Sequence, residues 1–434
     1  MKFTRELLPH AASAALEIEK CTSCGLCKEV CPVFALTQRE AESPRGKINL
    51  LKSLLEEAID PSPEAVDIFN RCLLCYACQD ACPAGVQTER IWIPAREILA
   101  DEVGRPLVKS FMLRQVLGNP RWWRFAMGVG KRFPGGRDTV KLGSFSLPRP
   151  AMDRIDRLLP EIIEPHRPFI GTVAYFPGCL LSEVFPYLGL QAAEILITLG
   201  YRVVTPADRV CCGAPAFNNG DMTTARKLAE RNLEIFTALN VDAVLSPDAT
   251  CGGAFTHEYD LLFPAGSLWR KTFVEFSEKV QNYGEFILNA INHRGMVSLN
   301  PINSRVTIHD SCHLSHLQHK AEVPRKLLSL IPGLKIVENP RSDLCCGFGG
   351  SYSVQFPNES KAITRRKLEY IGLVDGNIVV VGSPGCLWKM RSEAVQLGLN
   401  LRFVHYAELL WESLCKGQES INSQIQPDAA FSAK

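Results

Sequence analysis

The stretch DLCCGFGG, residues 343–350, places two neighbouring thiols in front of three glycines. Neighbouring side chains on an extended strand point to opposite faces, so Cys345 and Cys346 can face one bound group only where the chain bends sharply. Glycine permits such a bend and lets backbone amides approach sulfur, where they stabilise a negatively charged cluster. The stretch therefore predicts a turn that wraps a ligand for two thiolates.

This stretch is one half of an internal repeat. The segment RVCCGAP carries a second Cys-Cys-Gly (CCG) element, and a single cysteine lies before and after each element. The cysteines correspond in four pairs at separations of 133 to 135 residues: Cys179 with Cys312, Cys211 with Cys345, Cys212 with Cys346 and Cys251 with Cys386. One separation kept at four positions indicates a duplicated unit.

Alternating apolar and helical segments predict the same fold for both units. The β-type runs TVAYF, DAVLS, RVTIH and NIVVVG precede cysteines, and helical patterns follow the CCG elements. We expect Asp221 to cap the helix after the first element, and Ser360 or Asn358 to cap the helix after the second. This order predicts a parallel wound sheet in each unit, with the cysteines beyond the carboxyl ends of the strands.

The repeated cysteines are candidate metal ligands. Cytosolic thiols stay reduced, so clustered cysteines indicate metal rather than disulfides. The first unit offers Cys179, Cys211, Cys212 and Cys251, and the second offers Cys312, Cys345, Cys346 and Cys386. A redox-active vicinal dithiol or a zinc ion in one unit are the alternatives to an iron–sulfur centre, which we favour in at least one unit.

Two further cysteine motifs, CTSCGLCKEVCP and CLLCYACQDACP, lie near the N-terminus. Both have the ferredoxin spacing C-x2-C-x2-C-x3-C-P, in which the fourth cysteine binds the cluster of the other motif. The spacing therefore predicts one [4Fe–4S] cluster on Cys21, Cys24, Cys27 and Cys82, and a second on Cys72, Cys75, Cys78 and Cys31. Structural zinc is the less consistent alternative, because it prefers two CxxC pairs or a CxxC with histidines.

Helical patterns surround these motifs. Ser43 and Pro44 form a helix start, and leucines and isoleucines then recur at helical spacing. The stretch VQTERIWIPAREILADE reads as a closing helix after the second motif. We therefore expect a multidomain α+β protein, with a helical ferredoxin-like region before a duplicated α/β pair.

The composition is that of a globular protein with several domains. The chain has 434 residues, which is too long for one core, with 46% hydrophobic and 22% charged residues. A net charge of +2 gives no global case for binding nucleic acid. No run approaches the roughly 20 apolar residues of a membrane span, and charges such as Arg5 and Glu6 interrupt any signal peptide. We expect a cytoplasmic protein, in which Cys415, outside the patterned groups, is a buried free thiol.

Paired ferredoxin motifs followed by two CCG units resemble the iron–sulfur subunit of glycolate oxidase. The resemblance runs from about Cys21 to about Trp411 and includes the segments SPRGK, CGGAFTHEY and HDSCHLSHLQ. It implies the electron-transfer subunit of an oxidoreductase complex, with a flavin-containing 2-hydroxyacid dehydrogenase as partner. The resemblance also implies that the complex acts at the cytoplasmic face of the inner membrane. Each ferredoxin cysteine of this chain corresponds to a cluster ligand of the family.

The resemblance leaves other functions open. Related subunits serve D-lactate oxidation, anaerobic glycerol 3-phosphate oxidation and heterodisulfide reduction. In heterodisulfide reductases each CCG unit ends in CxxC, which supplies a fifth thiolate for a non-cubane cluster. Here Gly252 and Gly253 follow Cys251, and Leu387, Trp388 and Lys389 follow Cys386, so neither unit has the fifth thiolate. The disulfide-reductase function is therefore disfavoured.

No nucleotide-binding motif accompanies these cysteines. The segment GVGKRF at Gly128 lacks the third glycine of a dinucleotide fingerprint, and no P-loop pattern occurs. One-electron carriers without a hydride acceptor cannot readily oxidise a hydroxy acid. We therefore assign no catalytic residue to this chain and expect a flavin partner to oxidise the substrate, with electrons leaving toward a quinone or another acceptor.

Two regions remain without a single assignment. Residues 105–143 carry nine basic residues against Asp138 alone, interleaved with Trp and Phe. This composition suits either an interfacial helix on anionic lipid, or else a subunit interface or a brace between domains. His309, His313, His316 and His319 lie beside Cys312, and the last three repeat every three residues. They can donate to cluster sulfur, relay protons or simply be solvated helix histidines.

The domain boundaries follow from these motifs. We expect a ferredoxin-like region at 1–100, a basic aromatic segment with a linker at 101–168, CCG units at 169–298 and 299–415, and a disordered tail at 416–434.

Overall fold

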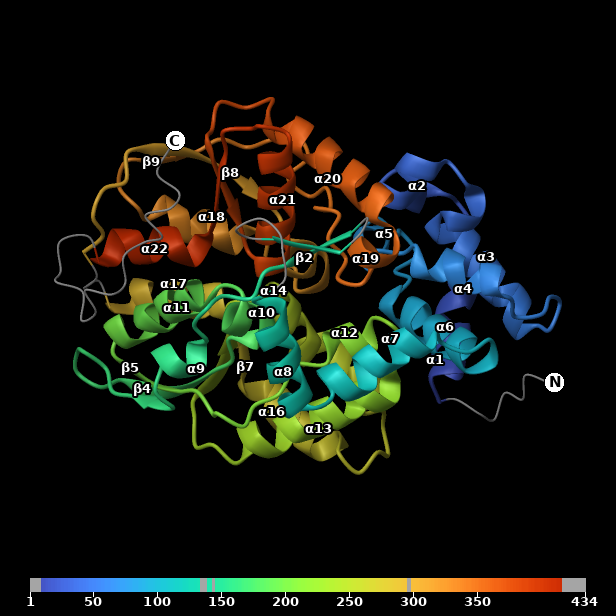
Figure 1. Ribbon diagram of the computed structural model, residues 1–434, viewed down its shortest axis with the longest axis horizontal. Coiled ribbons are helices and arrows are strands. Elements are labelled where there is room, and N and C mark those ends of the chain that lie inside the picture. The colour runs from blue at the N-terminus through green and yellow to red at the C-terminus, as the bar shows by residue number, and fades with distance from the viewer. Residues whose placement is uncertain (1–8, 133–138, 143–144, 295–297, 416–434) are drawn as a thin grey trace.

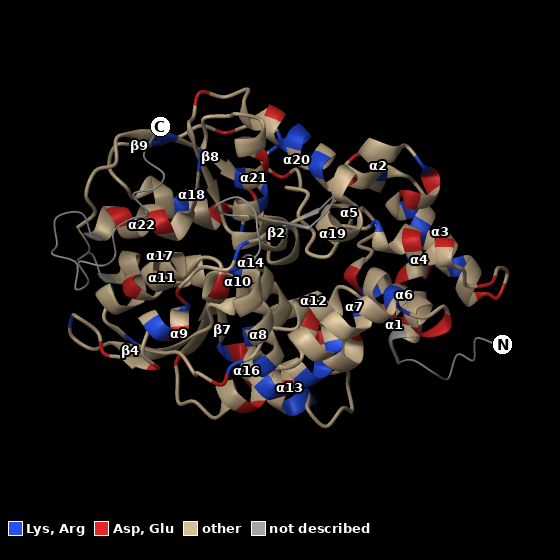
Figure 2. Cartoon of the chain, in the orientation of Figure 1, with Lys and Arg blue, Asp and Glu red and all other residues tan. Residues whose placement is uncertain are grey.

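The computed structural model describes residues 9–132, 139–142, 145–294 and 298–415, so the tail at 416–434 lies outside the described residues. A helical N-terminal region lies beside two α/β units, the first drawn in green and yellow and the second in orange and red (Figure 1). Lys and Arg are interspersed with Asp and Glu over all three parts (Figure 2). The expected α+β class is confirmed.

The N-terminal region consists of short helices around the two cysteine motifs. Its elements are α1 (Pro9–Glu19), η1 (Leu26–Lys28), α2 (Pro32–Thr37), η2 (Glu40–Glu42), α3 (Pro44–Leu55), α4 (Pro63–Asn70), α5 (Ala77–Asp80) and α6 (Glu89–Glu102). The predicted start of α3 is confirmed, because the Ser43 side chain accepts a hydrogen bond from the Gly46 amide and Pro44 is the first helical residue. Helix α6 is the expected closing helix.

A connecting segment follows α6 and runs along the first unit. Its elements are α7 (Leu107–Phe111), η3 (Met112–Leu117), α8 (Pro120–Gly130), β1 (Thr139–Leu142), β2 (Phe145–Pro148) and α9 (Ile155–Leu158). Arg114 forms an ion pair with Asp221 of the first unit at 3.3 Å, and the Arg105 guanidinium donates to the Gly220 carbonyl. Part of the basic segment therefore acts as the brace that was one of its predicted roles.

The first unit is built on a five-stranded sheet in the order β3-β5-β4-β6-β7, parallel except for the edge strand β3. Its strands are β3 (Ile162–Ile163), β4 (Gly171–Tyr175), β5 (Tyr201–Val204), β6 (Ala243–Ser246) and β7 (Val280–Asn282). Its helices are α10 (Gly178–Glu183), α11 (Pro186–Thr198), α12 (Ala214–Phe217), α13 (Met222–Thr237), α14 (Ala249–Gly253), η4 (Ala254–Glu258), α15 (Tyr259–Leu262), α16 (Arg270–Lys279) and α17 (Tyr283–Arg294).

The second unit has a fully parallel four-stranded sheet in the order β11-β10-β8-β9. Its strands are β8 (Ser304–His309), β9 (Leu334–Ile336), β10 (Ile378–Val381) and β11 (Arg402–His405). Its helices are η5 (His313–Leu317), α18 (Glu322–Ser329), α19 (Tyr352–Gln355), α20 (Pro357–Ile371), α21 (Pro384–Gln396) and α22 (Tyr406–Cys415).

The two sheets share one topology, as expected of a duplicated unit. Strands β4, β5, β6 and β7 correspond to β8, β9, β10 and β11, and in both sheets the first strand lies between the second and the third. The two units pack against each other through equivalent helices. Helix α11 of the first unit contacts α22 of the second, and their counterparts α18 of the second unit and α17 of the first are also in contact. Across this pseudo-twofold interface the Ser383 hydroxyl donates to the carboxylate of Asp248 at 3.1 Å, and each residue lies three positions before the last cysteine of its unit.

One of the two predicted helix caps is correct. Asp221 caps α13, because its carboxylate accepts a hydrogen bond from the Thr224 amide. The prediction of Ser360 or Asn358 as the cap of α20 is wrong, since the helix begins earlier, at Pro357. Proline is favoured at the first helical position, and Ser360 lies inside the helix, where its hydroxyl donates to the Gly347 carbonyl.

We predict that Gly347→Ala destabilises the fold more than Gly350→Ala. Both glycines have positive φ, +80° and +57°, so either alanine costs about 1–2 kcal/mol in backbone energy. A Cβ at Gly347 would also lie 2.6 Å from the Ser360 carbonyl oxygen, whereas nothing lies within 4 Å of one at Gly350. The apparent unfolding midpoint, followed by circular dichroism, should fall further for Gly347→Ala. Equal losses in the two variants would contradict the packing argument.

Candidate metal centres

The ferredoxin motifs form two cavities near the N-terminus, each lined by a crossed set of four cysteines. The first cavity is lined by Cys21, Cys24, Cys27 and Cys82, with Cys78 at its edge. The second is lined by Cys31, Cys72, Cys75 and Cys78. In both, three thiols come from one motif and the fourth from the other, and Cys78 borders both cavities.

Backbone amides and buried cations surround the second cavity. The Phe34 amide donates to Cys31 Sγ at 3.4 Å, and the Leu74 amide donates to Cys72 Sγ at 3.5 Å. Lys47, with 2% of its surface exposed, lines the cavity. Arg96 is buried and donates to the Cys72 carbonyl at 2.6 Å. These groups supply the positive potential that a negatively charged cluster needs.

Arg96 and Lys47 were missed by the sequence reasoning. Arg96 lies in the apolar stretch IWIPAREIL, where a buried charge is an available signal. Burial lowers the pKa of Arg96, while the nearby Cys72 opposes this shift. Arg96 also donates to the Asn218 carbonyl and thereby ties the loop before Cys72 to the first unit.

In the first unit four sulfurs are grouped beyond the ends of β4, β5 and β6. Cys179 contacts Cys211, Cys211 contacts Cys212, and Cys212 contacts Cys251. Gly178 lies against this group, because a Cβ there would be 2.7 Å from Cys251 Sγ. The CCG bend therefore brings both adjacent thiols to one group, as the sequence predicts.

The second unit repeats this arrangement. Cys312 contacts Cys345, Cys345 contacts Cys346, and the Sγ atoms of Cys346 and Cys386 are 3.0 Å apart. The Gly347 amide donates to Cys345 Sγ at 3.5 Å, so the glycine of the CCG element supplies the expected amide donor. Both units thus gather the four cysteines that their sequences share.

The second ferredoxin cavity adjoins the cysteine group of the second unit. Cys75 and Cys345 belong to one buried cluster, against which Cys312 packs. Burial, with a further contribution from the sulfurs of Cys345 and Cys312, raises the pKa of Cys75 well above its usual range. Gly349 allows the second unit to approach the second ferredoxin motif closely. A Cβ at this position would lie 2.5 Å from the side chain of Leu73, which belongs to that motif. The sequence carried no local signal for this juxtaposition.

Three of the four histidines near Cys312 are buried, so the prediction of solvated helix histidines is wrong for them. His309 ends β8 with 1% of its surface exposed, and His313 and His316 are 8% and 7% exposed. The His316 ring lies 2.8 Å from the Asp80 carboxylate of the N-terminal region, while His319 is mostly exposed. The residues after Cys312 form η5, a π-helix, which packs against α5 and α14 instead of facing solvent.

His313 connects the two CCG units. Its Nδ1 lies 3.5 Å from Cys312 Sγ, and its Nε2 lies 3.7 Å from the Glu258 carboxylate. Burial lowers the pKa of His313, but Cys312 and Glu258 outweigh this effect and hold the pKa at about 10. The charge of His313 also acts on Asp248, whose carboxylate lies 3.8 Å from Cys251 Sγ. His313 therefore links Cys312 of the second unit to Glu258 of the first.

The residues at these four sites fit iron–sulfur groups. Burial raises the pKa of the Cys78 and Cys75 thiols above their usual range, and the positive charge of a bound metal would favour their thiolate forms. Thiolates are the ligands of iron–sulfur clusters and of zinc, and amide donors to sulfur stabilise the former. The donor set of the first unit is thiols alone apart from the neighbouring Asp248, which suits a thiophilic metal.

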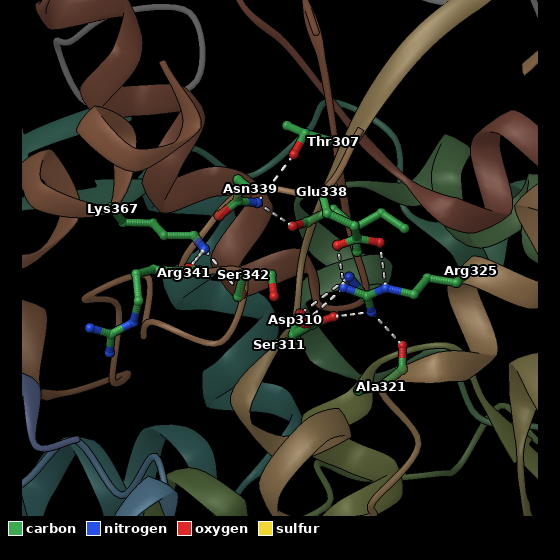
Figure 3. A network of polar contacts seen from close by, with 12 residues as sticks. Thr307, Asp310, Ser311, Ala321, Arg325, Glu338, Asn339, Arg341, Ser342 and Lys367 are labelled. Atoms are coloured by element: carbon green, nitrogen blue, oxygen red, sulfur yellow. Dashed lines mark hydrogen bonds and ion pairs between the residues drawn. The ribbon is translucent and has the colours of Figure 1, made fainter. Parts of the chain in front are cut away.

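A polar network holds the segment that leads to Cys345 and Cys346. Figure 3 shows Arg325 between Asp310 and Glu338, and Lys367 directed at the carbonyls of Arg341 and Ser342. Arg325 pairs with Asp310 at 2.7 Å and with Glu338 at 2.8 Å. The network fixes residues 338–342 against β8, so the CCG turn that follows starts from a defined position.

Comparison with known proteins finds two kinds of domain in this chain. The 4Fe-4S dicluster domain matches residues 17–86, and the cysteine-rich CCG domain matches residues 173–256 and 306–391. A probable glycolate oxidase iron–sulfur subunit of Bacillus subtilis is 29% identical over 92% of this chain and 94% of its own length. Lactate utilization protein A 2 of Bacillus cereus is 28% identical over 56% of this chain and 99% of its own length. A crystal structure of a hypothetical protein from Helicobacter pylori covers 88% of this chain and 71% of its own at 11% identity, with a TM-score of 0.49.

We predict that Arg325→Met destabilises the second unit by about 2–4 kcal/mol, because it leaves the nearly buried carboxylate of Asp310 without its partner. Arg305→Met is the matched control. Arg305 is 51% exposed and pairs with an exposed Asp375, so its loss should cost no more than about 1 kcal/mol. Chemical denaturation of both variants measures the difference, and a small loss for Arg325→Met would show that the network does not hold this segment.

Proposed function

We propose, from the premise that this chain belongs to the family of glycolate oxidase iron–sulfur subunits, that it transfers electrons for an oxidoreductase complex. In this proposal a flavin-containing 2-hydroxyacid dehydrogenase oxidises glycolate and delivers electrons to this chain. The eight ferredoxin cysteines hold two [4Fe–4S] clusters, and the CCG cysteines hold a further centre. Electrons then leave toward a quinone or another acceptor.

The observation that carries the proposal is the unbroken series of cysteine sites. Cys78 borders both N-terminal cavities, and Cys75 lies against Cys345 of the second unit. His313 then links Cys312 of the second unit to Glu258 of the first. Bound iron–sulfur clusters would supply one-electron transfer, and both ferredoxin sites and the cysteine group of the second unit adjoin one another in series. Such a series is expected of a relay and has no purpose in a zinc scaffold.

The substrate belongs to the partner and stays open between hydroxy acids. The similarity to a lactate utilization protein favours lactate as the second candidate, while glycerol 3-phosphate and disulfide substrates receive no support from a particular residue. Neither CCG unit contains the additional thiolate of a disulfide reductase. The chain therefore serves as the electron carrier in each of the favoured alternatives.

The exposed face of α7, η3 and α8 suits contact with an anionic lipid surface. Large apolar side chains are exposed there, namely Leu107, Val108, Phe111, Met112, Trp122 and Phe125. The rings of Phe111, Trp122 and Phe125 form edge-to-face contacts at 5.9–6.5 Å. Arg121 and Arg124 lie on the same helix α8, so apolar and basic side chains occur together, as in interfacial helices. Among the described helices, none combines the length and hydropathy of a bilayer span.

We predict that Cys75→Ser and Cys24→Ser each lower the rate of electron transfer from the flavoprotein at least about a hundredfold, because each removes a cluster ligand. Reduction of a dye by glycolate, with the reconstituted complex, measures the rate. Cys415→Ser is the control, since Cys415 lies outside the patterned groups, and its rate should be unchanged. Wild-type rates in Cys75→Ser, or glycolate oxidation by the isolated chain, would overturn the relay.

We predict that the double variant Trp122→Glu with Phe125→Glu binds vesicles that contain anionic lipid at least about tenfold more weakly. Two apolar contacts with the membrane are replaced by negative charges, which the anionic lipid repels. Leu268→Glu is the matched control, since Leu268 is 91% exposed and lies in the loop between α15 and α16 rather than on α7, η3 or α8. Co-sedimentation at low and high salt measures binding. Equal binding by the double variant and the control would assign this face to another partner.

A further inference from the structure

We propose that His309 is a metal ligand whose imidazole forms, with Cys346 and Cys386, a nitrogen–sulfur ion site in the second CCG unit. The proposal rests on metal binding by this unit and is independent of the electron-transfer role. It assigns a ligand beyond the shared cysteines, and it makes the two CCG units chemically different.

The position of His309 directs it to the cysteine group. His309 is the last residue of β8 and pairs in register with Val381, the last residue of β10, which leads into Cys386. The side chain is 1% exposed, and neither ring nitrogen has a partner at full hydrogen-bond geometry among the described residues, although the Ser342 backbone interacts with the ring. A polar group without a full hydrogen bond at such a depth is unfavourable. A bound metal ion would remove this cost.

The distances fit one ion. A ring nitrogen of His309 and the Sγ atoms of Cys346 and Cys386 lie within 4.8 Å of one another. This is the one group of at least three such donors that close together in the part of the chain that the structure describes. Metal–nitrogen and metal–sulfur bonds of about 2.0 and 2.3 Å place the ligands of a tetrahedral ion at similar separations. Small side-chain rotations therefore suffice to bind an ion.

The first unit cannot form this site. The segments FPGC and HDSC align at Cys179 and Cys312, which places Phe176 at the position of His309. Phe176 is 1% exposed and packs against Phe236 and Phe255, with ring centroids 5.8 and 4.8 Å away. The apolar ring offers no ligand atom. The first unit is therefore limited to thiolates and a neighbouring carboxylate, whereas the second adds an imidazole.

The donor set suits two kinds of ion. Tetrahedral sites with nitrogen and sulfur ligands bind zinc or an iron of a cluster. Replacing thiolate with imidazole at an iron of a cluster raises its reduction potential, as in histidine-ligated two-iron centres. Either ion gives the same ligand assignment. The metal whose spectrum shows a nitrogen ligand, zinc or iron, decides between the two ions.

The test measures metal coordination in the full chain, purified anaerobically. His309→Phe copies the residue of the first unit, and His309→Gly leaves a space that free imidazole can fill. His405→Asn is the matched control, because His405 is equally buried, ends β11 and pairs with the same Val381 from the other side. Asparagine keeps an acceptor for the Ala407 amide, which bonds His405 Nδ1 at 3.2 Å. X-ray absorption reports nitrogen ligands of zinc, and pulsed electron paramagnetic resonance with ¹⁵N-labelled histidine reports those of iron.

We expect a histidine nitrogen ligand in the wild type and in His405→Asn, its loss in His309→Phe, and its return in His309→Gly when imidazole is added. A signal at the zinc edge identifies zinc, and ¹⁵N coupling identifies cluster iron. Coordination by sulfur alone in the wild type, or an unchanged nitrogen signal in His309→Phe, would overturn the proposal. Electron transfer from the flavoprotein is measured in parallel, so a failed relay with intact nitrogen coordination contradicts only the proposed function.

Discussion

The structure depends on the burial of many sulfur atoms in small groups. A buried thiolate is unfavourable without a nearby positive charge, and four in contact repel each other. The protein meets this constraint with amides such as that of Gly347, with buried cations such as Lys47 and Arg96, and with space for metal. Glycines occur where a side chain would occupy the place of sulfur, as at Gly178. The folds of all three parts follow from this requirement.

The duplicated units are similar in topology but differ in surroundings. The second unit adjoins the N-terminal region through Cys75, through the Asp80–His316 pair at 2.8 Å and through the Arg71–Glu359 pair at 2.6 Å. The first unit shares one buried hydrophobic cluster with that region, in which Trp92 and Phe217 both take part. Two arginines add polar contacts: Arg96 donates to the Asn218 carbonyl, and Arg90 pairs with Asp260 at 2.6 Å. Equivalent helices pack across the pseudo-twofold interface between the units. The N-terminal region contacts the two units differently, so their surroundings are not equivalent. Duplication thus supplied two copies of one scaffold for different environments.

Local patterns in the sequence predicted the motifs, the strands before the cysteines, the duplication and the start of α3. Those features depend on residues close together in the chain, or on exact repetition. The contact between Cys75 and Cys345 joins segments 270 residues apart, and no local pattern specifies it. The three-residue spacing of the histidines suggested an exposed helix face, but η5 is a π-helix covered by α5. Tertiary packing decided their burial.

The first ferredoxin site is the most accessible of the four, because none of its cysteines Cys21, Cys24, Cys27 and Cys82 is buried, whereas each of the other sites has two or more buried cysteines. Cys24 is exposed, while Cys75 and Cys78 are buried. Dioxygen and peroxide therefore reach the outermost site before the inner ones, and susceptibility of sulfur to oxidation follows its exposure. Damage under aerobic conditions should begin at the outer end and spare the sites beside the second unit. Repair of a single peripheral group would then be enough to restore the protein.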